Sequence, residues 1–331
     1  MNKVISGACT ALAAVLVWSW AACAQRPVFE ASELEGSAQE KLPGKLAAPD
    51  LSGPQRAMPR HVASPLPNDQ RGSIRRVETG GRKLVALTFD LCELSDQRAG
   101  YDAPLVAVLR ELKAPATFFA GGRWMRSHPE RAMQLMADPL FEVGSHAWTH
   151  GNFGVLGREE MARQIDWTQA QYELLREDLA ALAGKRGVGE AVKGVRESIA
   201  VFRFPYGRCS AQALELLAAR GLAAVQWDVN MMDAAKSRTA EAIVRDALRQ
   251  VRPGSIVLGH ANGFGHATAE ALRALIPALR EKGYELVTVS ALLEAGKPAT
   301  TADCYDSRPG DTAVYDAQFG EGTVHPRRNR P

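Results

Sequence analysis

The sequence has few cysteines, little net charge and no long apolar run after its first 24 residues. Each of these shortages argues against one class of protein or site. Its five cysteines include no C-x-x-C pair, which argues against a zinc site built from cysteines alone. The net charge is +3 and the basic residues are spread out, so no nucleic-acid-binding surface is indicated. No internal repeat is visible. Hydrophobic residues (46%) and charged residues (23%) are instead present in the proportions of a globular protein with a sizeable core.

The first residues have the pattern of an export signal. Lys3 precedes the apolar run ACTALAAVLVWSWAA, and Ala22-Cys23-Ala24 offers a small-x-small cleavage site. This run is shorter than the about 20 residues of a transmembrane helix, so we expect no membrane span in the mature chain. We therefore expect residues 1–24 to be removed and the protein to be periplasmic or extracellular. Lipid modification of Cys23 is an alternative, although Trp20 stands where a small aliphatic residue is usual.

The remaining chain divides by composition into three parts. Residues 25–81 are rich in Pro, Gly, Ser and charge without a sustained period, which indicates a mobile linker. Residues 298–331 look like a loosely ordered tail. Between them, at 82–297, apolar strand patterns alternate with amphipathic helix patterns. The expected strands cover 83–90, 116–122, 141–147, 201–205, 222–229 and 254–261, and the apolar segment 284–293 ends the series.

This alternation predicts the α/β class, because strands separated by helices pair in parallel. About seven such units fit a distorted (β/α) barrel of about seven parallel strands better than an open sheet. The expected helices cover 101–114, with Asp102 as N-cap, and 128–138, 159–184, 210–221, 239–251 and 267–283.

Polar residues stand at the carboxyl ends of several expected strands, where β/α barrels build their active sites. They are Asp90, His146, His150, Arg203, Tyr206, Asp228, Asn230, Asp233 and His260. His146 and His150 are spaced by four, so on a helical turn both imidazoles could reach one metal ion. His260 follows a buried strand and precedes a Gly-rich loop, which favours an acid–base role.

Five motifs occur in a characteristic order: TFD at 88–90, H-x-x-x-H at 146–150, RFPYG at 203–207, WDVNMMD at 227–233 and VLGH at 257–260. Together, over about residues 82–295, they resemble the motif series of the polysaccharide deacetylase (NodB-homology) family of carbohydrate esterases. The resemblance implies a distorted β/α barrel that carries a metal-dependent N-deacetylase.

The resemblance also implies a role for each matching residue. Asp90 would be the general base, paired with Arg203, and His260 the general acid. His146 and His150 would hold a divalent metal, for which we expect zinc. The backbone N–H of Tyr206 would help to bind the oxyanion. The apolar residues expected to line the pocket for the acetyl methyl group are Trp148, Trp227, Leu258 and Phe264.

Two of the motifs depart from the family pattern. Members usually carry a second Asp directly after the first, as the third metal ligand, but this chain has Leu91. Glu93 is the preferred substitute. Alternatively the metal is held by the histidines with Asp90 or a group such as Asp96, or it is lost and the protein binds glycan without cleaving it. The second departure is Asn230 and Ala234 in place of the usual Asp and Trp, which leaves Asp233 to orient His260.

The cysteines outside the export signal are Cys92, Cys209 and Cys304. Cys92 and Cys209 follow motifs on one barrel face, so we expect a disulfide between them. Pairing of Cys304 and a thiolate ligand role for Cys92 are alternatives.

Three functions follow as hypotheses. The first is removal of N-acetyl groups from an extracytoplasmic amino-sugar polymer such as peptidoglycan, a chitin-like oligomer or an exopolysaccharide of the cell surface. The second is a non-catalytic glycan-binding module, and the third is an amidase that acts on a non-sugar C–N bond.

Overall fold

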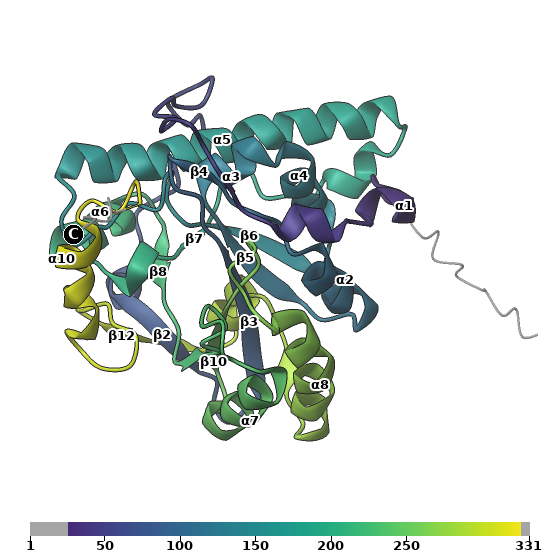
Figure 1. Ribbon diagram of the computed structural model, residues 1–331, viewed down its shortest axis with the longest axis vertical. Helices are drawn as coiled ribbons and strands as arrows, with labels where there is room; N and C mark the ends of the chain where they lie inside the picture. Colours follow the sequence, from purple (N-terminus) through teal and green to yellow (C-terminus); the bar gives the residue numbers. More distant parts are fainter. Residues whose placement is uncertain (1–25, 326–331) are drawn as a thin grey trace, which may run out of the picture.

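Seven strands close into a barrel in the computed structural model, which describes residues 26–325 (Figure 1). The expected export signal at 1–24 lies outside this range. Around the barrel the strands follow the order β3-β5-β6-β7-β8-β2-β10 and then β3 again. Their bounds are β2 (Ser73–Glu78), β3 (Leu84–Leu91), β5 (Ala116–Ala120), β6 (Phe141–Ser145), β7 (Val201–Phe202), β8 (Ala223–Val225) and β10 (Ser255–His260).

Neighbouring strands pair in parallel except at one place. The barrel closes between β2 and β10 through a single antiparallel bridge, which joins Arg76 and Ser255. The expected distorted β/α barrel is therefore confirmed, with one antiparallel contact added. Short strands extend or flank it: β1 (Gly44–Lys45), β4 (Gln97–Arg98), β9 (Val229–Asn230), β11 (Glu285–Leu286) and β12 (Lys297–Thr301).

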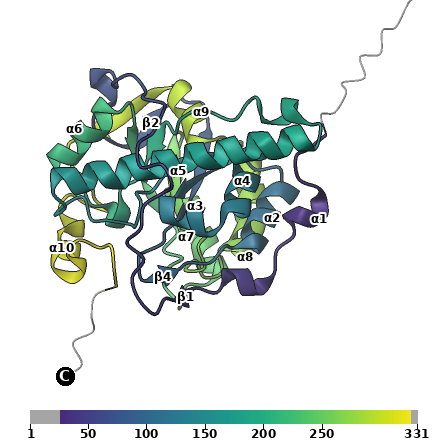
Figure 2. The same cartoon turned by 90° about the horizontal axis from the view of Figure 1, so that it is seen from above.

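Helices cover the outside of the barrel, and the long α5 crosses one side of it above α3 and α4 (Figure 2). The helices are α1 (Ala31–Leu34), α2 (Ala103–Glu111), α3 (Gly122–Ser127), α4 (Pro129–Ala137), α5 (Arg158–Lys185), α6 (Ala211–Ala219), α7 (Ala240–Gln250), α8 (Thr268–Glu281), α9 (Val289–Glu294) and α10 (Val314–Phe319). The Asp102 carboxylate accepts from the Leu105 N–H, so the expected N-cap of α2 is present.

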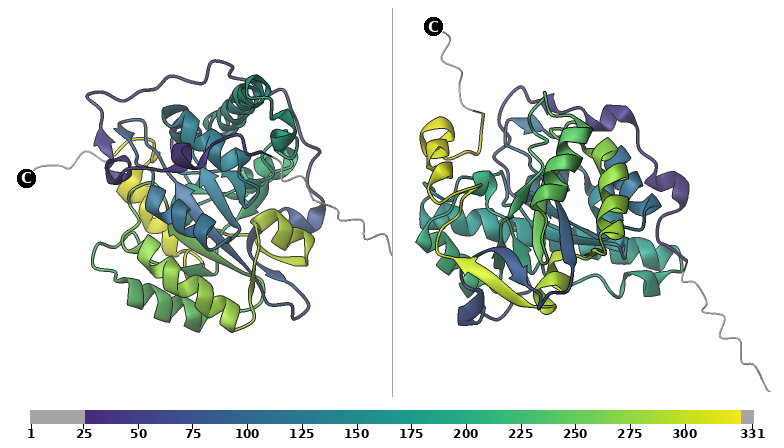
Figure 3. Two further views of the ribbon diagram at one scale, coloured as in Figure 1. Left: turned by 90° about the vertical axis from the view of Figure 1, so that its right-hand side faces the viewer. Right: turned by 90° about the horizontal axis from the view of Figure 1, so that it is seen from below.

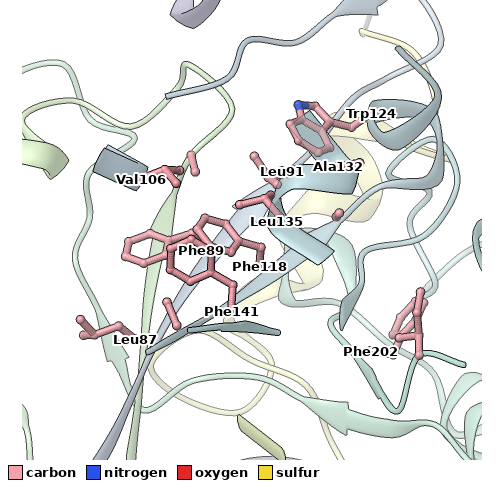
Figure 4. Packing of buried hydrophobic residues seen from close by; sticks show 14 of the residues in the cluster. Leu87, Phe89, Leu91, Val106, Phe118, Trp124, Ala132, Leu135, Phe141 and Phe202 are labelled. Carbon is pink, nitrogen blue, oxygen red and sulfur yellow. The ribbon is translucent and has the colours of Figure 1, made fainter. Parts of the chain in front are cut away.

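Side chains along β3 alternate between two separate hydrophobic clusters. Val85, Leu87, Phe89 and Leu91 pack outward with residues of the surrounding helices (Figure 4). Ala86 belongs to the second cluster, whose members come from strands all round the barrel and fill its interior. This is the two-residue period of a strand, and it turns the even-numbered residues of β3 toward the barrel axis.

One barrel strand lies in the segment that composition indicated to be linker. Strand β2 pairs with β8 and β12, so the folded unit begins before residue 82. Its buried apolar residues Ile74 and Val77 are three apart, so no alternating pattern marks the strand in the sequence. Conversely, the apolar segment 284–293 is not one strand, because β11 ends at Leu286 and Thr288 caps the short helix α9.

The preceding residues, 26–72, form an extended segment around the outside of the helices rather than a detached linker (Figure 3). It is held by its backbone and by charged contacts. The Tyr101 N–H donates to the Glu40 carbonyl at 2.7 Å, and Asp50 accepts from Arg126 at 2.6 Å. Proline-rich composition removes regular hydrogen bonding but does not prevent such docking.

The expected tail is also attached to the barrel as far as residue 325. Strand β12 pairs antiparallel with β2, and Arg208 pairs with Asp316 at 2.7 Å. The expected disulfide between Cys92 and Cys209 is wrong: Cys209 is bonded to Cys304, and their Cα atoms are 5.5 Å apart. The pairing of β12 with β2 brings Cys304 to Cys209, while Cys92 is free. Within residues 26–325, no helix combines the length and apolarity needed to cross a bilayer.

Replacing both Cys209 and Cys304 with Ser should lower the free energy of unfolding by about 2–5 kcal/mol, because this disulfide closes a long loop in the unfolded chain. Urea unfolding measures the change, and Cys92→Ser is the control that keeps the disulfide. Peptide mapping without reduction should recover a Cys209–Cys304 cross-link, and a cross-linked Cys92 would contradict the pairing.

Candidate active site

The polar residues at the strand ends meet at one mouth of the barrel. Asp90 and His260 are paired in register on the adjacent parallel strands β3 and β10. His146 follows β6, and its Nε2 lies 3.5 Å from Asp90 Oδ2. Arg203 follows β7 and is completely buried. The alternation of β3 and β10 explains this convergence, because Asp90 and His260 both continue the inward-facing rows.

Asp90 is held by a buried ion pair. The Arg203 guanidinium donates through Nη1 to Asp90 Oδ1 at 2.9 Å and lies 4.1 Å from the centre of the Phe119 ring. Its Nε and Nη2 donate to the carbonyls of Val225 and Gln226. Because every arm of the guanidinium is engaged, Arg203 fixes the carboxylate in one position.

The histidine pair lies in a loop and not on the helical turn that its spacing suggested. Ala147 and His150 both have left-handed backbone conformations, with φ of 65° and 60°. Such conformations are unfavourable for residues other than glycine and are often found at functional sites. The loop is held by α3 and α5: Gly122 N–H donates to the Ala147 carbonyl, and Gln164 accepts from the Thr149 N–H.

The two imidazoles are arranged as metal ligands. His146 Nδ1 donates to the Arg203 carbonyl at 2.9 Å, which leaves Nε2 with its lone pair free. His146 Nε2 and His150 Nδ1 are buried and have no hydrogen-bond partner among the described residues. One potential ligand atom each of Cys92, His146 and His150 lies within 4.8 Å of the others. Unpaired buried nitrogens beside a thiol fit a divalent metal.

Glu93, the expected third ligand, points elsewhere. Its Oε2 accepts from the Ala99 N–H at 2.9 Å and from the Ser127 hydroxyl at 2.8 Å, and Arg123 Nε is 3.3 Å from its Oε1. Burial outweighs these contacts and raises the pKa of Glu93 to about 7. Asp96, the other carboxylate considered, accepts from His325. The structure therefore brings Cys92, and not Glu93, to the histidines.

Asp233 holds His260 on the other side of the mouth. Its Oδ1 accepts from His260 Nδ1 at 2.8 Å, and its Oδ2 accepts from the His260 N–H and the Thr268 hydroxyl, each at 2.8 Å. This is the contact expected from the sequence, and Asp233 makes it without exposure to solvent. It leaves Nε2 as the free nitrogen of His260.

The three histidines of the site differ in the direction in which their surroundings shift the imidazole pKa. Burial lowers the pKa of His146, and burial together with the charge of His146 lowers the pKa of His150 well below its usual value. Burial would also lower the pKa of His260, but the charge and hydrogen bond of Asp233 outweigh burial and raise it. Burial and the Asp90 charge raise the pKa of Cys92, an effect that a nearby cation reverses. Two imidazoles are thus neutral and able to bind a metal, and one favours the protonated form.

Tyr206 and the C-terminal segment form the remaining wall. Tyr206 has φ 60°, and its ring centre lies 4.4 Å from that of His150. Its hydroxyl donates to the Gly322 carbonyl at 2.9 Å, and its ring stacks on Phe319. No sequence pattern indicates this wall, because nothing in residues 302–325 identifies the loop that they contact.

The four residues expected to bind substrate differ in where their side chains lie. Trp148 is 2% exposed and packs against Trp167, so it belongs to the core and not to a pocket surface. Leu258 faces the barrel interior two residues before His260. Phe264 is partly exposed in the loop after β10.

Trp227 is nearly buried, and its indole N–H donates to Asp306 at 2.8 Å. Asn230 donates to the same oxygen of Asp306 at 2.9 Å. The Asp306 carboxylate, from the C-terminal segment, thus holds two residues of the WDVNMMD motif. The sequence analysis did not predict this role for Asp306.

Replacing Asp233 with Asn should lower the pKa of His260, because the raising charge is lost while burial stays. His260 would then lose its proton at a lower pH than in the wild type. An NMR titration of the imidazole resonances measures this shift. The control is Asp96→Asn, which removes a carboxylate in contact with His325 and should leave the pKa of His260 unchanged. An unchanged His260 titration in Asp233→Asn would contradict the assignment.

Comparisons with known proteins agree with this geometry. A family model described as polysaccharide deacetylase matches residues 77–181. A chitooligosaccharide deacetylase of Sinorhizobium fredii is 32% identical over 215 residues, which cover 62% of this chain and 89% of that protein. A deacetylase solved with substrate is 29% identical with a TM-score of 0.52, covering 70% of this chain and all (100%) of that one.

A further solved structure is a mutant, with restored enzymatic activity, of a Bacillus anthracis pseudoenzyme of carbohydrate esterase family 4. The mutant is 25% identical with a TM-score of 0.54, and the match covers 67% of this chain and 71% of that one. The share of the Sinorhizobium relative that is matched, together with the strand-end residues, establishes the family. The chain belongs to the polysaccharide deacetylase (NodB-homology) family of carbohydrate esterases.

Proposed function

We propose that this protein is an exported, zinc-dependent hydrolase that removes N-acetyl groups from an amino-sugar polymer of the cell envelope or its surroundings. The enzymes of its family are metal-dependent hydrolases. The observation that carries the proposal is the pairing of Asp90 and His260 on adjacent strands, beside two imidazoles with unpaired nitrogens. Export is supported by the N-terminal sequence pattern and by the Cys209–Cys304 disulfide, which suits an oxidising compartment.

Asp90 is the general base in this mechanism. Amide hydrolysis needs a water that has lost a proton, and Asp90 accepts this proton through the carboxylate that Arg203 holds. A divalent cation at the neighbouring imidazoles, when bound, would make water more acidic and polarise the amide carbonyl. The ion pair with Arg203 keeps the carboxylate from turning away from the attacking water.

His260 is the general acid. The amine of an amino sugar is a poor leaving group, so its nitrogen must gain a proton as the C–N bond breaks. Asp233 holds Nδ1 of His260, favours the protonated ring and leaves Nε2 free to donate. Neutral histidines on one side of the substrate and a protonated one on the other divide the metal-binding and acid roles.

The oxyanion of the tetrahedral intermediate needs a hydrogen-bond donor. No acceptor for the Tyr206 backbone N–H is found within residues 26–325, and the left-handed conformation of Tyr206 sets the direction of this group. A free N–H beside His150 supports a role in binding the oxyanion.

A second candidate is a glycan-binding module that does not cleave its ligand. It is favoured by Leu91 in place of the usual Asp and by the similarity to a protein described as a pseudoenzyme. The two candidates differ in one measurement, the release of acetate from an N-acetylglucosamine oligomer. A panel that includes non-sugar amides tests the amidase alternative in the same assay.

Asp90→Asn should reduce acetate release by roughly 10²–10⁴-fold, because it removes the general base while keeping the shape of the side chain. Metal content, measured by mass spectrometry of the metals, should stay near the wild-type value. Activity close to wild type would show that another group is the base.

His150→Ala should lose both bound metal and acetate release, because it removes one of the unpaired nitrogens. A chelator should inhibit the wild type, and added zinc should restore it. His325→Ala is the matched control, since His325 contacts Asp96 outside the histidine pair. Chelator-resistant acetate release would contradict the metal-dependent mechanism, and glycan binding without any release would favour the binding module.

A further inference from the structure

We propose that the Cys92 thiolate is the third protein ligand of the metal, so that the centre is a cysteine–histidine–histidine site. The proposal rests on the proposed function only in assuming that this site binds a metal. It concerns the residue that replaces the missing carboxylate after Asp90, and it rests on the unpaired histidine nitrogens and on the contacts of the turn that follows β3.

Leu91 supplies no metal ligand, and its side chain lies away from the site. Leu91 has no solvent exposure and packs outward with the helix-facing cluster that also contains Leu135 and Trp124 (Figure 4). Strand β3 ends at Leu91, and Cys92 in the turn that follows has its donor atom near the two histidines. The ligand position has therefore moved by one residue, from 91 to Cys92.

The distances at the site suit a small metal centre. The closest donor atoms of Cys92, His146 and His150 lie within 4.8 Å of one another. Zinc bonds of about 2.0–2.3 Å bring tetrahedral ligands somewhat closer than this limit, so a slight inward movement completes the shell. His146 is 1% exposed and its Nε2 has no hydrogen-bond partner within the described range, so a buried nitrogen without a hydrogen bond lies near the thiol.

The turn that carries Cys92 is fixed on three sides. The Gly121 N–H donates to the Leu91 carbonyl at 3.0 Å, and Asn262 Nδ2 donates to the Cys92 carbonyl at 3.0 Å. Glu93, buried between Arg123 and Ser127, anchors the next residue. Glu93 is thus a positioning residue for Cys92, and the thiol needs little ordering when a metal binds.

A thiolate changes which metal the site prefers. Carboxylate oxygens suit Mg²⁺ and Mn²⁺, whereas thiolate with imidazole suits zinc and its spectroscopic substitute cobalt. Three protein ligands also leave one tetrahedral position open, as catalytic zinc sites require. We therefore expect binding of Zn²⁺ and Co²⁺ in preference to Mg²⁺ or Mn²⁺.

Absorption spectra of the Co²⁺-loaded protein test the ligand directly. A thiolate ligand gives an intense near-ultraviolet charge-transfer band that imidazole and carboxylate ligands do not give. We expect this band in the wild type and its loss in Cys92→Asp, which keeps a ligand and retains bound cobalt. Asp96→Asn is the matched control, and it should keep the band because Asp96 contacts His325 and not the two metal-binding histidines.

A second readout is the reactivity of Cys92 toward an aromatic disulfide reagent, which Zn²⁺ loading should slow. Bound cobalt without the band in the wild type, or a band that persists in Cys92→Asp, would overturn the proposal. The proposed function is tested separately. If the wild type shows the band but releases no acetate, Cys92 is a ligand and the proposed deacetylation is contradicted. If the wild type binds cobalt and releases acetate but shows no band, the deacetylation is supported and Cys92 is not a ligand.

Discussion

The pleat of β3 is the constraint on which the site depends. Its outward row packs against the helices and its inward row ends in Asp90, so burial of the outward row fixes the direction of the Asp90 carboxylate. The same alternation buries Leu91, the last residue of β3, and Cys92 follows in the turn beside the histidines. A shift of β3 by one residue relative to its neighbouring strands would turn Asp90 toward the helices and Leu91 toward the barrel mouth. Such a shift is unfavourable because it would bury a carboxylate in the hydrophobic core. Core packing and site geometry are therefore set by the same strand.

The barrel mouth supplies two different environments for the same side-chain type. His146 and His150 are buried without a neighbouring carboxylate strong enough to charge them, whereas His260 shares a buried hydrogen bond with Asp233. This difference in environment, and not residue identity, underlies the metal-binding and acid–base roles that we propose for these histidines. Left-handed backbone at His150 and Tyr206 is tolerated because α3, α5 and the C-terminal segment hold the loops on which they lie. The unfavourable conformations are thus maintained by tertiary contacts.

Segments at both ends of the described chain pack against the loops at the barrel mouth and hold them in position. Residues 26–72 hold the loop after β3 from outside, and the C-terminal segment holds Trp227, Asn230 and Tyr206 through Asp306 and Gly322. The disulfide of Cys209 with Cys304 ties this second segment to the loop that follows β7. The candidate site is therefore shaped partly by residues outside the five motifs.

The sequence alone determined the α/β alternation, the helices with their caps, and the strand-end positions of Asp90, Arg203 and His260. These features follow from local periodicity and from residue type, which a linear pattern records. It could not place β2, since Ile74 and Val77 show no alternation, nor could it exclude Glu93 as a ligand or Trp148 as a pocket residue. Only the tertiary structure decided that Cys304 pairs with Cys209 and that Cys92 adjoins the histidines. The physical reason is that side-chain direction and long-range proximity arise when the barrel closes, and neither is encoded in spacing along the chain.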